Sequence, residues 1–166
     1  LGAPPEGSRA LEIMKDSRIG AFGAIALVLA IGLKVALLAT LAGQDEVAAA
    51  AAVLAAHVLS RYTPLFMIRG LPYVGGEGGK AKPLADALGS RSMLTASLWS
   101  LPAVWVLWAS QPLANALAAG VLLVATAGWL MHYFRRRLEG FTGDCLGATQ
   151  QLCEIAVYLA LAVQPS

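Results

Sequence analysis

The sequence predicts an all-α integral membrane protein, folded as a bundle of about five transmembrane helices. Of the 166 residues, 58% are hydrophobic and only 13% are charged, and the mean hydropathy is +0.67. A soluble domain of this size needs more charged residues to cover its surface. Long apolar runs dominate, and the alternating pattern of amphipathic strands is absent, so the spans are expected to be helical.

Five apolar stretches account for the expected spans, all in one membrane domain. They cover residues 21–42, 47–66, 92–109, 113–134 and 144–163. Each is close to the roughly 20 residues that a helix needs to cross a bilayer. Lys34 interrupts the first stretch, where its ammonium group either reaches the interface or faces the interior of the bundle. Cys145 and Cys153 lie eight positions apart on one expected helix, about 12 Å along its axis, which is too far for a disulfide.

The positions of the basic residues predict the orientation in the membrane. Lys and Arg occur in three segments outside the spans, residues 1–20, 69–91 and 135–137, whereas the turns at Asp45 and Gln111 contain none. These two sets alternate along the chain, so the positive-inside rule places the basic segments in the cytoplasm. The net charge is only +2, and no nucleic-acid partner is expected.

Residues 1–20 are expected to form a cytoplasmic segment at the membrane surface. Glu12, Lys15, Asp16 and Arg18 lie within two helical turns of one another. One interpretation is an amphipathic interfacial helix that leads into the first span. The interpretation that we favour is a charged patch that faces a polar substrate, because glycines at the start of the span leave the backbone open there.

A glycine-rich stretch, Gly140–Ala148, places the carboxylate of Asp144 at the start of the last span. Helical spacing puts Asp144, Gln151 and Glu154 on one broad face. An ionisable residue at such a position is a candidate for a functional site. The alternative is that Asp144 only caps the start of the helix.

Two further candidates lie near the end of the second span and after it. His57 and Arg61 share one helical face, where the histidine either takes part in chemistry or only bonds a neighbour. The segment Arg69–Pro83 is rich in glycine and flanked by basic residues. Its backbone amides suit a phosphate group, although it lacks the Walker pattern, and a flexible linker would have the same composition.

Three of these segments resemble blocks of the cobalamin synthase family. Residues 11–23, with the sequence LEIMKDSRIGAFG, closely resemble one block, and Ser60-Arg61 and Gly140–Ala148 resemble two more. The similarity runs from Leu1 to the C-terminus. In that family an aspartate-rich stretch comes directly before this region, and Leu1-Gly2 resembles its end. We therefore expect the chain to be a fragment of the enzyme, and to be inactive alone.

The resemblance implies a magnesium-dependent transferase in the bacterial cytoplasmic membrane, with several spans and a cytoplasmic active face. The family joins adenosylcobinamide-GDP to α-ribazole or its phosphate and releases GMP, which is a phosphoryl-transfer reaction in the last steps of vitamin B12 synthesis. The residue types suggest the roles. The implied metal ligands are Asp16, Asp144 and Glu154; the implied phosphate-binding residues are Arg18, Arg61 and Arg69; the implied catalytic residues are His57 and Lys15.

Two other membrane functions compete with this interpretation. In a small transporter, Lys34, His57, Asp144 and Glu154 would line an ion path, and their charges would lie near the membrane midplane. Most charges in this sequence instead fall near the ends of spans. The other alternative is a CDP-alcohol phosphotransferase, but the double Asp-Gly-Ala-Arg pattern of those enzymes is absent from the sequence.

Overall fold

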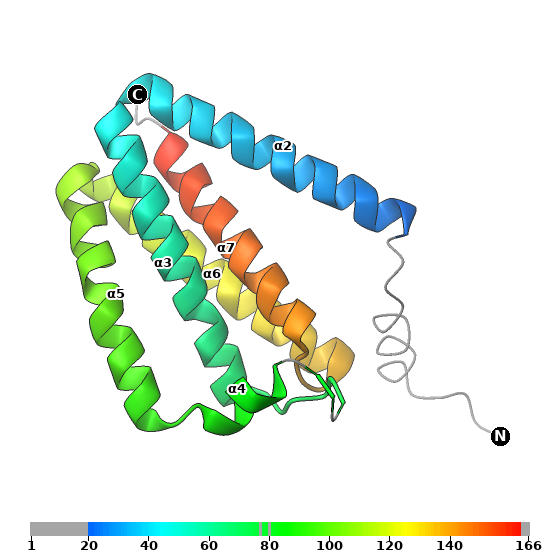
Figure 1. Ribbon diagram of the computed structural model, residues 1–166. Helices are drawn as coiled ribbons and strands as arrows, with labels where there is room; N and C mark the ends of the chain where they lie inside the picture. Colours follow the sequence, from blue (N-terminus) through cyan, green and yellow to red (C-terminus); the bar gives the residue numbers. More distant parts are fainter. Residues whose placement is uncertain (1–19, 77, 80, 164–166) are drawn as a thin grey trace.

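A computed structural model describes residues 20–76, 78, 79 and 81–163, and these form six helices in a bundle (Figure 1). The helices are α2 (Ala21–Gln44), α3 (Glu46–Gly70), α4 (Lys82–Ala87), α5 (Ser90–Ser110), α6 (Leu113–Leu138) and α7 (Gly143–Ala162). All but α4 are long and apolar enough to cross a membrane. The predicted fold class, an all-α membrane protein with about five spans, is confirmed.

The long helices begin and end within about four residues of the stretches expected from the sequence. The largest differences are at the ends of α3 and α6, which continue to Gly70 and Leu138. Helix α3 also runs through Pro64, which cannot donate a hydrogen bond to the carbonyl of Ser60. The hydroxyl of Thr63 donates to that carbonyl instead, at 2.9 Å. In a membrane such a substitute donor makes an internal proline tolerable.

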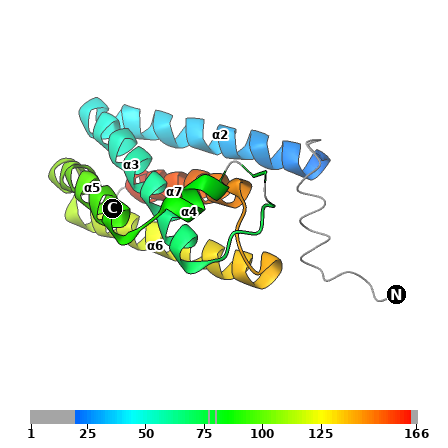
Figure 2. The same cartoon turned by 60° about the horizontal axis from the view of Figure 1, so that its bottom comes forward.

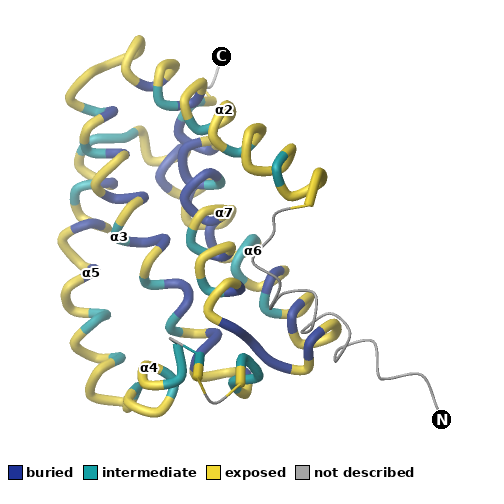
Figure 3. The backbone as a smooth tube through the Cα atoms, turned by 45° about the vertical axis from the view of Figure 1, so that its right-hand side comes forward, coloured by how far each residue is buried: buried dark blue, intermediate teal, exposed yellow. Residues whose placement is uncertain are grey.

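Helices α3 and α7 form the centre of the bundle, and α7 lies between α2 and α6 (Figure 2). Most buried positions belong to these two central helices (Figure 3). On α3 the buried residues of the first half are alanines, at positions 49, 52, 55 and 56. Small side chains allow two helix backbones to approach closely, so this alanine-rich run suits close helix packing.

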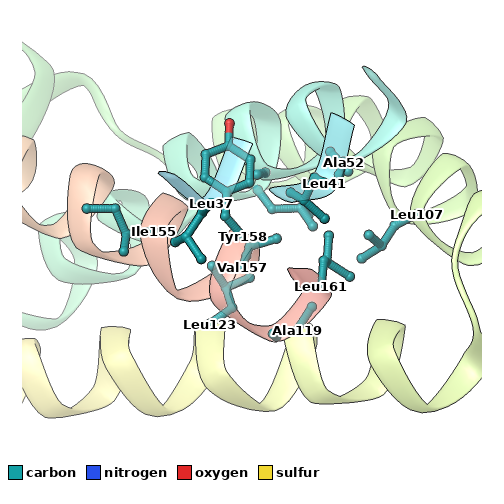
Figure 4. Close-up of a cluster of buried hydrophobic side chains, with 14 of the residues drawn as sticks. Leu37, Leu41, Ala52, Leu107, Ala119, Leu123, Ile155, Val157, Tyr158 and Leu161 are labelled. Carbon is teal, nitrogen blue, oxygen red and sulfur yellow. The ribbon is translucent and has the colours of Figure 1, made fainter. Parts of the chain in front are cut away.

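The core of the bundle is an apolar cluster to which all five long helices contribute buried residues (Figure 4). Val157, Tyr158 and Leu161 of α7 are each at most 1% exposed. They pack against Leu37 and Leu41 of α2, while Ala52 of α3 and Leu123 of α6 belong to the same cluster. Neither cysteine is in a disulfide, as the sequence predicts, and both are buried.

Helix α2 packs against the core of the bundle only from Ala30 toward its C-terminal end. Its buried residues are Leu37 and Leu41, whereas from Ala21 to Leu33 all side chains are exposed except the half-buried Ala24 and Ala30. The helix diverges from α7 toward Ala21 (Figure 1). One residue, Asp45, joins it to α3. Asp45 ends α2 and also caps α3, because its carboxylate accepts a hydrogen bond from the backbone of Ala48 at 2.8 Å.

The described basic residues outside the spans all gather at one end of the bundle, which we call the basic end. Helices α3 and α6 finish there, and α5 and α7 begin there. The described residues of this end include Arg69, Lys82, Arg91 and Arg135–Arg137. At the opposite end the described part of the chain has Asp45 and Glu46 but neither Lys nor Arg. Side-chain amides join the helices at that end: Gln44 donates to Ala162, and Asn115 donates to Val163.

The sequence predicts one long polar segment over residues 69–91. The structure of the loop after α3 differs from this prediction. The described part contains the short helix α4, and the start of the loop is fixed to the turn between α6 and α7. Phe141 donates its backbone N–H to the Pro72 carbonyl at 2.9 Å, and Val74 donates to the Phe141 carbonyl at 3.0 Å. The rings of Tyr73 and Phe141 also meet edge to face, with centroids 5.5 Å apart. These contacts argue against a freely flexible linker in this part.

Gly140 is the residue that lets this loop approach the α6–α7 turn. A Cβ atom there would collide with the Pro72 carbonyl and the Val74 side chain. We expect Gly140→Ala to lower the free energy of unfolding by about 1–3 kcal/mol, the usual effect of overpacking. Chemical unfolding in detergent micelles, followed by circular dichroism, measures it. The control is Gly128→Ala on α6, where a Cβ meets open space. Gly128→Ala should be neutral or stabilising by up to about 1 kcal/mol, and equal losses in both variants would contradict the prediction.

Candidate functional site

The residues singled out in the sequence lie at two different depths in the described structure. Lys15, Asp16 and Arg18 lie outside the described residues. Asp144 and Arg69 lie at the basic end, whereas His57 and Glu154 lie near the middle of α3 and α7. Arg61 lies one helical turn from His57, on the side of the basic end.

At the basic end, Asp144 is exposed in the first turn of α7. It does not cap the helix, so the alternative interpretation of this residue is wrong. The cap is Thr142, whose hydroxyl accepts a hydrogen bond from the backbone N–H of Cys145 at 3.4 Å. Thr142 is buried, while Gly143 and Gly147 beside Asp144 are exposed. The carboxylate is therefore open to a ligand that approaches from outside the bundle.

Several guanidinium groups share this end with Asp144. Arg69 is exposed, and its Nη1 donates to the Ser90 hydroxyl at 3.3 Å. The Nη2 of Arg135 donates to the Gly70 carbonyl at 3.4 Å, which joins α6 to the end of α3. A surface with several positive charges and an accessible carboxylate suits a phosphate-bearing ligand. Arg69, predicted to bind phosphate, has the exposure that this role requires.

A second group of polar side chains, which we call the half-depth cluster, joins α2, α3 and α7 near their midpoints. It consists of Lys34, His57, Gln151, Glu154 and Tyr158. The Lys34 ammonium lies 3.0 Å from Glu154 Oε1 and donates to Gln151 Oε1 at 3.1 Å. The Tyr158 hydroxyl donates to Glu154 Oε1 at 2.9 Å. His57 Nδ1 lies 3.8 Å from the same oxygen.

Glu154 is the centre of this cluster. The residue is 3% exposed, and an unpaired carboxylate at this depth would be strongly destabilising. Lys34 supplies the opposite charge and is only 26% exposed. The sequence allows the Lys34 ammonium either to reach the membrane interface or to face the bundle interior. In the structure it faces the interior.

The metal candidates of α7 do not come together. Asp144 and Glu154 are ten residues apart on one helix, which separates them by about 15 Å along its axis. One magnesium ion cannot bind both carboxylates, because its ligands lie about 2.1 Å from it. Glu154 is instead bonded to Lys34 and Tyr158. Among the described residues no three His, Cys, Asp or Glu side chains gather as a metal site.

His57 lies with Glu154 and not with Asp144. Its side chain is 53% exposed, and its carbonyl accepts a hydrogen bond from Arg61 Nη1 at 3.1 Å. The shared face of His57 and Arg61, expected from their spacing, is therefore present. The hydrogen bonds of Gln151 with Lys34 and of Tyr158 with Glu154 were not predicted from the sequence, although Gln151 and Tyr158 lie three and four positions from Glu154 on one helix.

The cap on α7 can be separated from the candidate ligand by mutation. We expect Thr142→Ala to lower the free energy of unfolding by about 1 kcal/mol, because it removes the capping oxygen. Asp144→Asn should cost no more than about 0.5 kcal/mol, since only an exposed charge at the helix start is lost. Unfolding of both variants in the same detergent provides the comparison. A larger loss for Asp144→Asn would mean that the carboxylate holds the helix start after all.

Comparison with known proteins places this architecture in a family. The family model described as cobalamin-5-phosphate synthase matches residues 1–162. A protein of Albidiferax ferrireducens is 48% identical over 98% of this chain and 64% of its own length. A protein of Polaromonas naphthalenivorans is 48% identical over 98% of this chain and 63% of its own. Both are named adenosylcobinamide-GDP ribazoletransferase. No solved structure matches the chain. The chain spans slightly less than two thirds of these relatives, and it belongs to the cobalamin-5-phosphate synthase family.

Proposed function

We propose that the protein to which this chain belongs is an adenosylcobinamide-GDP ribazoletransferase of the bacterial cytoplasmic membrane. The observation that carries the proposal is the family match over residues 1–162, together with relatives of that name at 48% identity. In the proposed reaction a hydroxyl of α-ribazole, or of its phosphate, attacks the phosphate that bears the cobinamide arm. The new phosphodiester forms, the bond to GMP breaks, and the hydroxyl proton passes to a base or to water.

We assign this chemistry to the basic end. A diphosphate that reacts there needs positive charge to balance its oxygens, and Arg69 is exposed at that end. Arg18 and Lys15 come from the segment that precedes α2, with Lys15 as the catalytic candidate. Arg61 lies eight residues before Arg69 on α3, about 12 Å deeper along the axis, and we propose that it contacts a more distant phosphate or base of the substrates.

We further propose that Asp144 and Asp16 hold a magnesium ion. The chemistry of the donors fits: a carboxylate oxygen is a hard ligand, and the exposed position of Asp144 leaves room for the waters that Mg²⁺ retains. Such an ion, when bound, would neutralise charge on the phosphate oxygens. We no longer assign Glu154 to this ion, because it lies about 15 Å deeper. The same depth makes His57 unsuitable as the base at a phosphate held beside Asp144, so its role must be tested separately.

The half-depth cluster is the feature that would favour a transporter, since it places Lys34 and Glu154 near the middle of the spans. Its charges are paired with each other, however, and the Tyr158 hydroxyl adds a hydrogen bond to the carboxylate. The family match favours the transferase over both the transporter and the CDP-alcohol phosphotransferase.

The activity can be tested in a chimera in which this chain replaces its matching segment in the Albidiferax ferrireducens relative. The purified chimera, in lipid nanodiscs with adenosylcobinamide-GDP, α-ribazole and magnesium, should release GMP and form the corrinoid product. Asp144→Asn should lower kcat at least about 100-fold if the carboxylate holds the ion. The matched control is Asp86→Asn, which removes an exposed carboxylate from α4 at the same end.

Three outcomes are informative. Loss of product in Asp144→Asn but not in Asp86→Asn supports the function and the site. Product that Asp144→Asn leaves unchanged keeps the transferase but removes Asp144 from the metal. No product from a folded, membrane-inserted chimera rejects the proposed function.

The proposed orientation places the basic end in the cytoplasm. Alkaline phosphatase, which is active only outside the cytoplasm, should be active when fused after Val163 and inactive when fused after Gly78 in the loop between α3 and α4. The fluorescence of green fluorescent protein fused at the same two positions should show the reverse pattern. The opposite pattern of both reporters would invert the topology and contradict the positive-inside assignment.

A further inference from the structure

We infer that Lys34 and Glu154 are positioning residues, which set the separation between the start of α2 and the start of α7. Only the part of the inference that concerns catalysis rests on the proposed function. The geometric part concerns described residues alone. It consists of one ion pair at half-depth and of two helices, α2 and α7, that diverge toward their N-terminal ends (Figure 1).

The ion pair lies where the packing of α2 ends. Toward Gln44, α2 contributes Leu37 and Leu41 to the core, and Gln44 donates to the carbonyl of Ala162. In the other direction Ala30, one turn from Lys34, is the last residue of α2 that packs against the core. Beyond it the exposed half of the helix has no described contact that fixes its direction. Lys34 is therefore the charged contact nearest to the point of divergence.

Small changes at this point become larger at the helix starts. Ala21 lies 13 residues from Lys34, roughly 20 Å along α2, and Asp144 lies roughly 15 Å from Glu154 along α7. A rotation of α2 by roughly 10° about the ion pair would move Ala21 by roughly 3 Å. The segment with Lys15, Asp16 and Arg18 is covalently joined to this start of α2. Reacting groups displaced by about 1 Å already lose much of their rate.

The ion pair also has a physical reason to hold its geometry. Glu154 is almost fully buried, so its carboxylate cannot exchange Lys34 for water without rearranging the helices. The Lys34 ammonium is directed by two acceptors on α7, the carboxylate and the Gln151 amide oxygen. Two acceptors one helical turn apart fix the lysine along the axis of α7 as well as across it.

The experiment measures distance and activity in the same full-length protein, the chimera described above. Spin labels at Ala26 of α2 and Ala148 of α7, both exposed positions, report the separation of the two helices by pulsed electron paramagnetic resonance in nanodiscs. The variants are Lys34→Met, the charge-neutral double Lys34→Met with Glu154→Gln, and the conservative Lys34→Arg. The control is Thr40→Val, since the Thr40 hydroxyl bonds only the Ala36 carbonyl within α2.

Loss of the ion pair should lengthen the mean distance by about 2 Å or more and broaden its distribution. It should also lower kcat by tenfold or more, with a smaller change in KM. Lys34→Arg and Thr40→Val should keep the distance, and their kcat should stay within about threefold of the parent. If Lys34→Met alone fails to fold, the double variant provides the test, because the double variant leaves no unpaired charge of the ion pair in the bundle.

An unchanged distance distribution in the folded double variant would overturn the inference, as would an altered distance with an unchanged kcat. The two proposals fail in different ways. If no variant and no parent protein transfers ribazole, the proposed function is rejected, but the distance measurement still tests the ion pair. Loss of activity in the double variant with an unaltered distance would show that Lys34 and Glu154 act on the reaction without positioning α2.

Discussion

The carboxylate of Glu154, buried at half-depth between three helices, is the constraint on which the arrangement of α2 depends. A charge at this depth must be paired, because neither lipid nor the apolar core can solvate it. Lys34 supplies the pairing charge at 3.0 Å, and the Tyr158 hydroxyl supplies a hydrogen bond at 2.9 Å. Helix α2, which buries only two side chains, is thereby tied to α7 at a defined point along its length.

Other contacts in the bundle also reflect the absence of water from the bilayer core. Backbone groups must be satisfied inside the protein, so Thr63 replaces the donor that Pro64 lacks, and Asp45 both ends α2 and caps α3. Hydrophobic burial gives little preference for one helix contact over another in lipid, and close packing of small residues takes its place. The buried alanines of α3 allow such close packing against its neighbouring helices.

The structure separates two kinds of polar residue that the sequence analysis assigned to one site: exposed charges at the basic end and paired charges at half-depth. Exposed charges at the basic end can meet a soluble, phosphate-bearing substrate, and the proposed reaction belongs there. The paired charges at half-depth are too far from Asp144 to share its ion. In the proposed transferase the chemistry would take place at the surface of the bilayer, and the inferred role of the ionic contacts inside the bundle is to set the geometry of the helices that bear the reacting groups.

The sequence by itself determined the fold class, the five spans and the family, because hydropathy over about 20 residues and the blocks at residues 11–23 and 140–148 are local signals. The clustering of basic residues at one end also follows from their order along alternating spans. Only the tertiary structure decided that Lys34 would meet Glu154, since these residues are 120 positions apart and their pairing depends on how α2 crosses α7. The same holds for the loop after α3, whose composition resembles a linker, but which is held by Phe141 once α6 and α7 bring that residue beside Pro72. Spacing along one helix placed Asp144 and Glu154 on a common face but could not show that neighbouring helices would bury one carboxylate and leave the other exposed.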